Sequence, residues 1–199
     1  IILRQTIPCE PCKESKATLL AFKHKIPEQY RATRSLERID ADLHGPIAPP
    51  PLSGARYSLV AVDAFSDFAW VEPIKSKDEA ASKIMKLVKQ LHTQFGVYPA
   101  NIHTDRGGEF LSQELKEFYE EHGIKATQAP PYTPQLNGRA ERMNRTLITQ
   151  TRTMMQAAHA PRELWGEAIV AAAMLHNRLK VHDDGSTPLQ RLTDKHAIT

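Results

Sequence analysis

Hydrophobic and polar positions in the first half of the chain predict three β-strands. Within residues 36–43, Asp40 and Asp42 fall on one side of a strand, where side chains repeat with a period of two. Residues 56–74 contain two runs of β-forming residues, and a Ser-Asp pair between the runs supplies a turn. Two strands this close along the chain form an antiparallel hairpin, which we expect to continue from the first strand.

The second half alternates helical and strand patterns. Apolar residues recur at helical spacing after Ser76, and Gly96 ends that helix. The segments that follow are a strand near 100–104, a helix in 112–123, a strand in 124–128, a long helix over 137–158 and an apolar helix over 162–180. The order β-β-β-α-β-α-β-α-α predicts an α/β fold, a mixed five-stranded sheet flanked by helices.

Composition is that of a globular protein. The 199 residues are 41% hydrophobic and 25% charged, enough for one domain or one domain with arms. The net charge of +3 permits a nucleic-acid partner without requiring one. No run of 18 apolar residues occurs, so we expect no membrane span. The chain opens at Ile1 without Met or a signal peptide, and we expect a piece of a longer polypeptide or a trimmed chain.

The pattern divides the chain into residues 1–34, a basic arm, and residues 35–199, which carry the predicted strands and helices. The arm is either an appended segment or a solvated tail. It holds the only cysteines, Cys9 and Cys12, in a Cys-x-x-Cys pair. Such a pair is half of a zinc site or a redox pair, and no βαβ context favours the redox reading. Half a zinc site is the better interpretation, although the other two ligands are not evident.

Three carboxylates lie where the predicted elements can bring them together. Asp42 is on the first strand, Asp105 directly follows the fourth, and Glu141 is one turn into the long helix. In a mixed sheet the first and fourth strands can be neighbours, and functional groups gather outside the carboxyl ends of parallel strands. The first turn of the long helix can then lie against that edge of the sheet.

Such a cluster is stable only when cations neutralise it, because like charges repel by several kcal/mol in a low dielectric. Ligand sets made only of oxygen favour Mg²⁺ or Mn²⁺ over zinc. Two such ions about 3.5–4 Å apart suit in-line phosphoryl transfer. The three acids therefore indicate a two-metal site.

Each acid also has an ordinary explanation. Asp42 can cap the turn before the Gly-Pro pair, Asp105 can be a turn residue before Gly-Gly, and Glu141 can pair with Arg145 at i,i+4. Taken singly, each explanation is more common than catalysis. The spacing of all three, together with the order of elements, favours the metal site.

Basic residues surround Glu141. The basic cluster is Arg139, Arg142, Arg145 and Arg152, and the i,i+3 spacing within it places several of these residues on one helix face. Arginines that neutralise phosphates supply sequence-independent DNA affinity. A solvated amphipathic face is the usual alternative, and only the proximity of the three acids favours DNA.

Three motifs together resemble the catalytic core of retroviral and retrotransposon integrases, most closely the copia-type LTR-retrotransposon branch. They are IDADLHGP, HTDRGGEF and PYTPQLNGRAERMNRTL. The family has 35 residues between the second Asp and the Glu of its triad, and 35 separate Asp105 from Glu141 here. The resemblance implies an RNase H-like fold for residues 35–199. It also implies that Cys9 and Cys12 end an N-terminal His-His-Cys-Cys zinc module whose histidines would precede Ile1.

By this resemblance, Asp42, Asp105 and Glu141 hold two Mg²⁺ or Mn²⁺ ions, and the chain is a polynucleotidyl transferase. A 3′ hydroxyl of cDNA attacks a target phosphodiester, and 3′-end processing is a further candidate activity. The DNA-contacting residues are expected to be Arg139, Arg142, Asn144 and Arg145. Asp40, which shares the strand face of Asp42, is a candidate helper that need not bind metal.

The resemblance also implies partners and location. They are double-stranded DNA (cDNA ends and target), further copies of the chain and a candidate host tethering protein, with no membrane. Zinc is expected in the full-length protein. The expected location is the nucleus, reached through a cytoplasmic virus-like particle.

Two rival functions share part of this pattern. RNase H shares the fold but needs another carboxylate on the helix after the third strand; Glu79 is accounted for as the capping-box partner of Ser76. The rival from another class is a non-catalytic DNA- or protein-binding module derived from an integrase. Three mutually repelling acids argue against a retired site, but the module stays open as the alternative.

Overall fold

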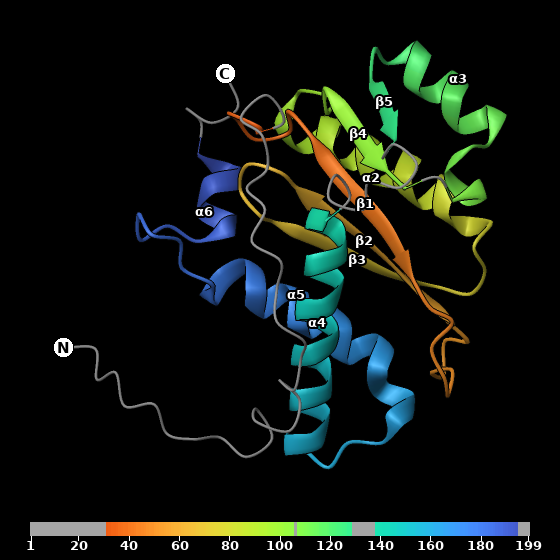
Figure 1. Cartoon of the computed structure of the whole chain (residues 1–199), viewed down its shortest axis with the longest axis vertical. Helices are drawn as coiled ribbons and strands as arrows, with labels where there is room; N and C mark the ends of the chain where they lie inside the picture. The colour runs from red at the N-terminus through yellow and green to blue at the C-terminus, as the bar shows by residue number, and fades with distance from the viewer. Residues whose placement is uncertain (1–30, 106, 129–137, 195–199) are drawn as a thin grey trace.

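The computed structural model describes residues 31–105, 107–128 and 138–194 (Figure 1). The strands are β1 (Ile39–His44), β2 (Tyr57–Asp63), β3 (Ala69–Ile74), β4 (Asn101–Thr104) and β5 (Lys125–Gln128). The helices are α2 (Glu79–Phe95), α3 (Gln113–Glu121), α4 (Gly138–Ala157), α5 (Trp165–Leu179) and α6 (Pro188–Thr193), with 3₁₀ turns η2 (Gly108–Phe110) and η4 (Arg162–Leu164). The predicted order of strands and helices is confirmed.

The sheet has the strand order β3-β2-β1-β4-β5. β1 pairs antiparallel with β2, and β2 antiparallel with β3, which confirms the predicted hairpin and its continuation from the first strand. β1 and β5 both pair parallel with β4. The first and fourth strands are therefore neighbours that run in the same direction, as the carboxylate prediction requires.

β1 begins later than the pattern of residues 36–43 predicted. Leu36 has a φ of 62°, a left-handed conformation that ends an extended strand, and its N–H donates to Asp63 Oδ1 at 2.8 Å. The strand therefore starts at Ile39. Alternation alone could not show this break, because the tertiary partner Asp63 lies on the next strand.

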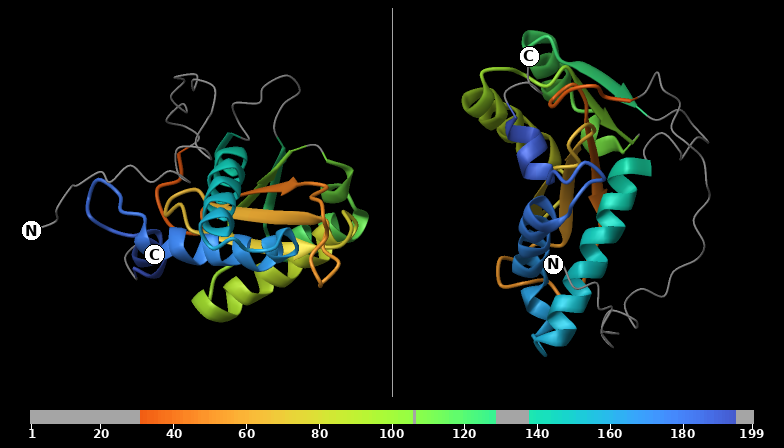
Figure 2. Two further views of the ribbon diagram at one scale, coloured as in Figure 1. Left: turned by 90° about the horizontal axis from the view of Figure 1, so that it is seen from below. Right: turned by 90° about the vertical axis from the view of Figure 1, so that its left-hand side faces the viewer.

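The sheet separates two hydrophobic cores, one on each face. On β2, Leu59 and Ala61 point into the core covered by α2 and α3, whereas Val60 and Val62 point into the core covered by α4 and α5. Figure 2 shows the helices on the two sides of the sheet. Both faces of β2 are buried, so this strand is a continuous apolar run instead of an alternating one.

The two ends of α2 show which local signals acted as expected. Gly96 ends the helix in the left-handed conformation, with φ 76° and its N–H donating to His92 O at 2.8 Å. At the start, the Glu79 carboxylate accepts from Ser76 N at 3.1 Å, but the N-cap is Asp78, which makes no side-chain cap. The capping box predicted from Ser76 and Glu79 is therefore only half formed.

α4 buries the stripe that its sequence predicted. Ala140, Met143, Leu147 and Thr151 are buried, and Met154 is half-buried against the same core. α5 packs beside it, and its apolar residues Ile169, Ala172 and Ala173 fill the space between the helix and the sheet. Across the described part of the chain, none of the helices has both the length and the apolar character that crossing a bilayer demands.

Candidate active site

Asp42 lies in β1, where α4 crosses the sheet. Its Oδ2 accepts a 2.7 Å hydrogen bond from Asn144 Nδ2, which orients the carboxylate toward the first turns of the helix. Burial raises the pKa of Asp42 to about 6; the bond from Asn144 opposes that rise, and the charges of Asp105 and Glu141 add to it. The two other predicted acids are therefore close enough to repel Asp42.

The register of the parallel strands β1 and β4 determines the position of Asp105 relative to Asp42. Ala41 and Thr104 are the last paired residues of β1 and β4, and Asp42 and Asp105 come one step further along each strand. Asp105 is half-buried, and its Oδ1 accepts from Gly107 N at 2.9 Å. The carboxyl ends of two adjacent parallel strands thus present one acid each, as the strand order predicted.

Glu141 completes the neighbourhood from the helix side. It is exposed in the first turn of α4, three residues before the Asn144 that binds Asp42. In residues 31–105, 107–128 and 138–194, however, no three His, Cys, Asp or Glu side chains converge tightly enough to hold a metal ion. The three acids are neighbours, but they do not form a closed ligand shell.

The chemistry of the site suits a hard divalent cation. Its donors are carboxylate oxygens, which Mg²⁺ and Mn²⁺ prefer. Within the described residues, the buried Oδ1 of Asn144 has no hydrogen-bond partner, so a polar atom beside Asp42 is left for a water or a ligand. The raised pKa of Asp42 indicates that a nearby positive charge would be favourable there.

Asp40, two residues before Asp42, is placed quite differently. The residue is 1% exposed, with Arg38 Nε at 2.6 Å from Oδ1 and Arg139 Nε at 3.5 Å from Oδ2. Burial raises the pKa of Asp40, and the two guanidiniums act against that rise. Asp40 already has its cations in the protein, so we assign it a structural role in fixing β1.

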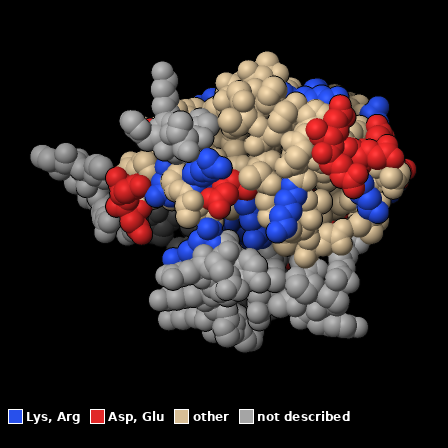
Figure 3. All heavy atoms as spheres, turned by 90° about the horizontal axis from the view of Figure 1, so that it is seen from above, with Lys and Arg blue, Asp and Glu red and all other residues tan. Residues whose placement is uncertain are grey.

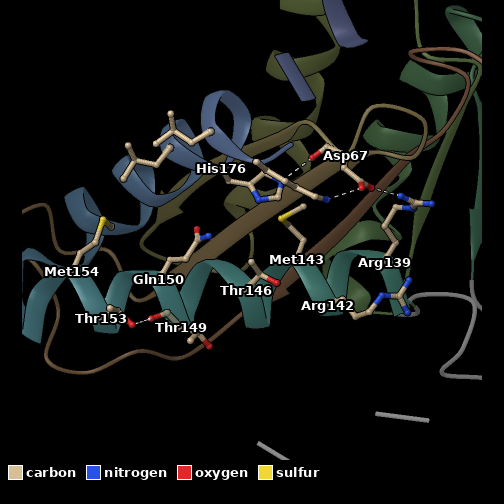
Figure 4. Close-up of a pocket in the computed structure, with 13 residues that line it drawn as sticks. Asp67, Arg139, Arg142, Met143, Thr146, Thr149, Gln150, Thr153, Met154 and His176 are labelled. Atoms are coloured by element: carbon tan, nitrogen blue, oxygen red, sulfur yellow. Dashed lines mark hydrogen bonds and ion pairs between the residues drawn. The ribbon is translucent and has the colours of Figure 1, made fainter. Parts of the chain in front are cut away.

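Arg139 is the bridge in this arrangement. Besides Asp40, it forms an ion pair with Asp67 in the β2–β3 turn, and Lys180 Nζ lies 2.8 Å from the other Asp67 oxygen. Figure 4 shows Asp67 between Arg139 at the start of α4 and the side chains of α5. These ion pairs tie the first turn of α4, which carries Glu141, to the sheet.

A groove of about 800 Å³ runs beside this bridge between α4 and α5. Thr146, Thr149 and Thr153 line it along α4 (Figure 4). From α5, His176 Nε2 lies 3.1 Å from Asp67 O, and burial lowers the pKa of His176. The groove therefore starts at the Asp67 ion pairs and leads away from the three acids.

The predicted DNA-binding residues fall into two groups. Arg142 and Arg145 are exposed on α4. Arg139 is engaged in the ion pairs just described, and Asn144 is 4% exposed and bound to Asp42. The structure gives the second pair contacts inside the protein, and DNA contact by any of the four stays a prediction.

Sequence reasoning missed the ion pairs around Asp67. The Ser-Asp turn was predicted, but not that its Asp joins Arg139 and Lys180, which lie 72 and 113 positions further along the chain. No local pattern signals such contacts. Cys9, Cys12 and almost all of the predicted arm at residues 1–34 lie outside the described residues.

The fold is the RNase H-like fold of integrase catalytic cores, as predicted. The chain is similar to the simian T-cell lymphotropic virus intasome in complex with the PP2A regulatory subunit B56 gamma, with a TM-score of 0.68 and 22% identity over 94% of this chain and 63% of that one. It is also similar to the HTLV-2 integrase catalytic core domain in complex with magnesium. There the TM-score is 0.62 and the identity 24%, over 81% of this chain and 99% of that one.

Residues 32–134, about half of the chain, match the integrase core domain family, and the chain belongs to this family. It is 33% identical over 174 residues to the retrovirus-related Pol polyprotein from transposon TNT 1-94 of Nicotiana tabacum, covering 86% of the chain. It is 30% identical over 188 residues to that from transposon RE1 of Arabidopsis thaliana, covering 94%. The resemblance to copia-type integrase cores is confirmed. The chain spans only 13% and 12% of the lengths of these polyproteins.

Proposed function

We propose that this chain is the catalytic core of an LTR-retrotransposon integrase, which joins cDNA 3′ ends to target DNA. The observation that carries the proposal is the position of Asp42, bound by Asn144, next to Asp105 along the paired strands and within reach of the Glu141 charge. We assign these three acids to two Mg²⁺ or Mn²⁺ ions. The magnesium in the similar HTLV-2 core supports this choice.

Bound at these carboxylates, two divalent ions supply activation of the attacking oxygen and stabilisation of the leaving oxygen at phosphorus. The chain's own residues prepare the site. Asn144 fixes the orientation of Asp42, and Gly107 N holds one oxygen of Asp105. Exposed Glu141 can adjust its side chain when substrate arrives. A P–O bond forms to the cDNA 3′ oxygen, whose hydroxyl proton leaves to solvent; the P–O bond to the target 3′ oxygen breaks, and that oxygen takes a proton from solvent to become a free 3′ hydroxyl.

The distribution of charge supports an approach of DNA from the α4 side. Arg142 and Arg145 are exposed on α4. In Figure 3 the largest group of acidic side chains lies on the side where Figure 1 places α3, and this helix carries exposed Glu114, Glu117, Glu120 and Glu121. A polyanion is repelled from the α3 side and attracted to basic residues near Asp42.

Within a longer protein, we propose the remaining features that the sequence implied. Cys9 and Cys12 belong to a zinc module, copies of the chain assemble on double-stranded DNA, and the complex acts in the nucleus. The similarity to an intasome chain that is in complex with a host regulatory subunit supports an assembly and leaves room for a tethering protein. Trimming of the 3′ ends is a candidate second reaction at the same acids.

RNase H activity is disfavoured by the position of its candidate fourth acid. The Glu79 carboxylate accepts from the backbone N–H groups of Lys75 and Ser76, both at 3.1 Å, at the start of α2. α2 packs on the face of the sheet opposite to α4. Glu79 thus serves a helix end and does not join Asp42.

The test is strand transfer by the purified chain with Mn²⁺, comparing wild type with Glu141→Gln. We expect joining to fall by at least about 100-fold, because a ligand of the metal site is lost, while DNA affinity measured by anisotropy stays the same. Glu120→Gln, an exposed acid of α3, is the matched control and should join like wild type. A Glu141→Gln variant that joins normally removes that residue from the mechanism. DNA binding without joining, even by wild type, would favour the non-catalytic module.

A further inference from the structure

A second cavity, of about 910 Å³, lies between the end of β1 and the second half of α4. It extends the site described above. His44 lies two residues beyond Asp42 on the same face of β1, and Arg152 lies eight residues beyond Asn144 on α4. Eight residues of helix correspond to about 12 Å. At about 3.4 Å of rise per nucleotide of a B-DNA strand, Arg152 lies roughly three or four nucleotides from Asn144.

The lining of this cavity is basic. Arg152, Arg162, His44 and His159 line it, and none of its described lining residues is Asp or Glu. His44 and Arg152 line the same cavity, one from β1 and the other from α4. In the described part of the chain, neither arginine forms an ion pair with a carboxylate. Such an arrangement favours an anion.

The other walls are apolar and held in place. Ile47, Met155 and Trp165 contribute to them. Trp165 Nε1 donates to Pro49 O at 2.9 Å, and Ile47 N donates to Arg56 O at 2.6 Å, so the loop between β1 and β2 is fastened on both sides. A preformed pocket with an apolar wall and a charged mouth suits a ligand that is itself half apolar and half anionic.

A nucleotide has this character, because its phosphate is anionic and its sugar and base offer apolar faces. We propose that this cavity binds a backbone phosphate of the DNA strand that extends from Asp42, with the adjoining nucleoside against Ile47 and Trp165. The identity of the polyanion rests on the proposed function. Arg152 and Arg162 hold the phosphate, and His44 lies between this phosphate and the three acids.

The experiment measures DNA affinity by anisotropy over a series of salt concentrations, without divalent metal. We expect Arg152→Ala/Arg162→Ala to lower affinity about 10-fold and to reduce the slope of log K against log salt by about 1, since the two arginines share one phosphate and each phosphate contact contributes about 0.9. Arg152→Lys/Arg162→Lys should keep the slope. Both arginines are exposed, and the thermal midpoint should not change.

Lys86→Ala/Arg178→Ala is the matched control, because it removes the same charge from exposed positions on α2 and α5. If the Arg152/Arg162 variant loses no more affinity and slope than this control, the phosphate site is refuted. Strand transfer is measured in parallel. A wild-type chain that joins DNA, with an unchanged slope in the variant, overturns the phosphate site alone. A wild-type chain that binds but never joins, with the slope reduced as expected, overturns the enzyme and keeps the site.

Discussion

The side chains of Asp40 and Asp42 lie on the same face of one strand, two residues apart, but the charged groups around them differ in sign. Asp40 is 1% exposed and lies against Arg38 and Arg139. Asp42 has an amide donor, Asn144; burial raises its pKa, and the charges of Asp105 and Glu141 add to that rise. One carboxylate has its cations within the fold, whereas the other lies in a neighbourhood of negative charge.

This difference separates structural from functional acids. Burying a charge costs several kcal/mol, and a protein offsets the cost with partners of opposite charge when only stability matters. Among the residues that the structure describes, Asp42 has no such ion pair and lies beside two acids, and acids in such surroundings are candidates for functional sites. Asp40 fits the first case and Asp42 the second.

The largest expected effect comes from making Asp40 resemble Asp42. Arg38→Met removes the closest cation of Asp40 and should lower the free energy of unfolding by about 3 kcal/mol at pH 8, because a buried carboxylate loses its main partner. The loss should shrink as the pH falls, since protonated Asp40 needs no cation. Urea unfolding at several pH values measures this. A loss that is equally large at pH 4 would show that Arg38 acts by packing and not by charge.

Neutralising Asp42 should raise the free energy of unfolding, whereas the loss of Arg38 lowers it. Its folded pKa of about 6 lies above the ordinary 3.8, so its ionised form opposes folding; the penalty is absent below about pH 4, grows between pH 4 and 6, and is complete above 6. In the absence of divalent ions, Asp42→Asn should raise the free energy of unfolding at pH 7.5 by about 1–2 kcal/mol.

Addition of Mg²⁺ sharpens this test. The cation should raise the thermal midpoint of the wild type above pH 6, where Asp42 is ionised, and should raise that of Asp42→Asn much less. If Asp42→Asn is less stable than the wild type at neutral pH without metal, the carboxylate is not electrostatically strained, and its contrast with Asp40 fails.

The smallest expected effect concerns Arg139, which the sequence assigned to DNA. Arg139→Met should lower stability by only about 1 kcal/mol, because Asp40 keeps Arg38 and Asp67 keeps Lys180. Joining should fall several-fold, since the first turn of α4 is less firmly held, while the salt slope of DNA binding stays unchanged. A slope reduced by about 1 at unchanged stability would instead make Arg139 a phosphate contact, as the sequence predicted.

Most of the fold was predictable because its signals are local. The capping by Gly96, the buried stripe on α4 and the order of strands and helices follow from periodicity and turn residues. The start of β1 was not predictable, since Leu36 takes its conformation from a contact with Asp63. The capping box at Ser76 was half wrong because Asp78 became the N-cap.

For the candidate site, the residue types and spacing indicated the three acids, and the parallel pairing of β1 with β4 agrees with their expected meeting. Which arginines form ion pairs inside the protein and which are exposed was less predictable. Arg139, Arg142 and Arg145 have the same chemistry and the same helical spacing. Only burial and the turn at Asp67 distinguish Arg139 from the other two.

The sequence by itself determined which segments become strands and helices, and which acids stand at their ends, because backbone preference and side-chain periodicity act over a few residues. The tertiary structure decided which charges neutralise one another. Arg139 reaches Asp67 across 72 positions, and Asp42 meets Asn144 across 102. Coulomb energy and desolvation depend on distance in space and on burial, and neither quantity can be read from positions along a chain.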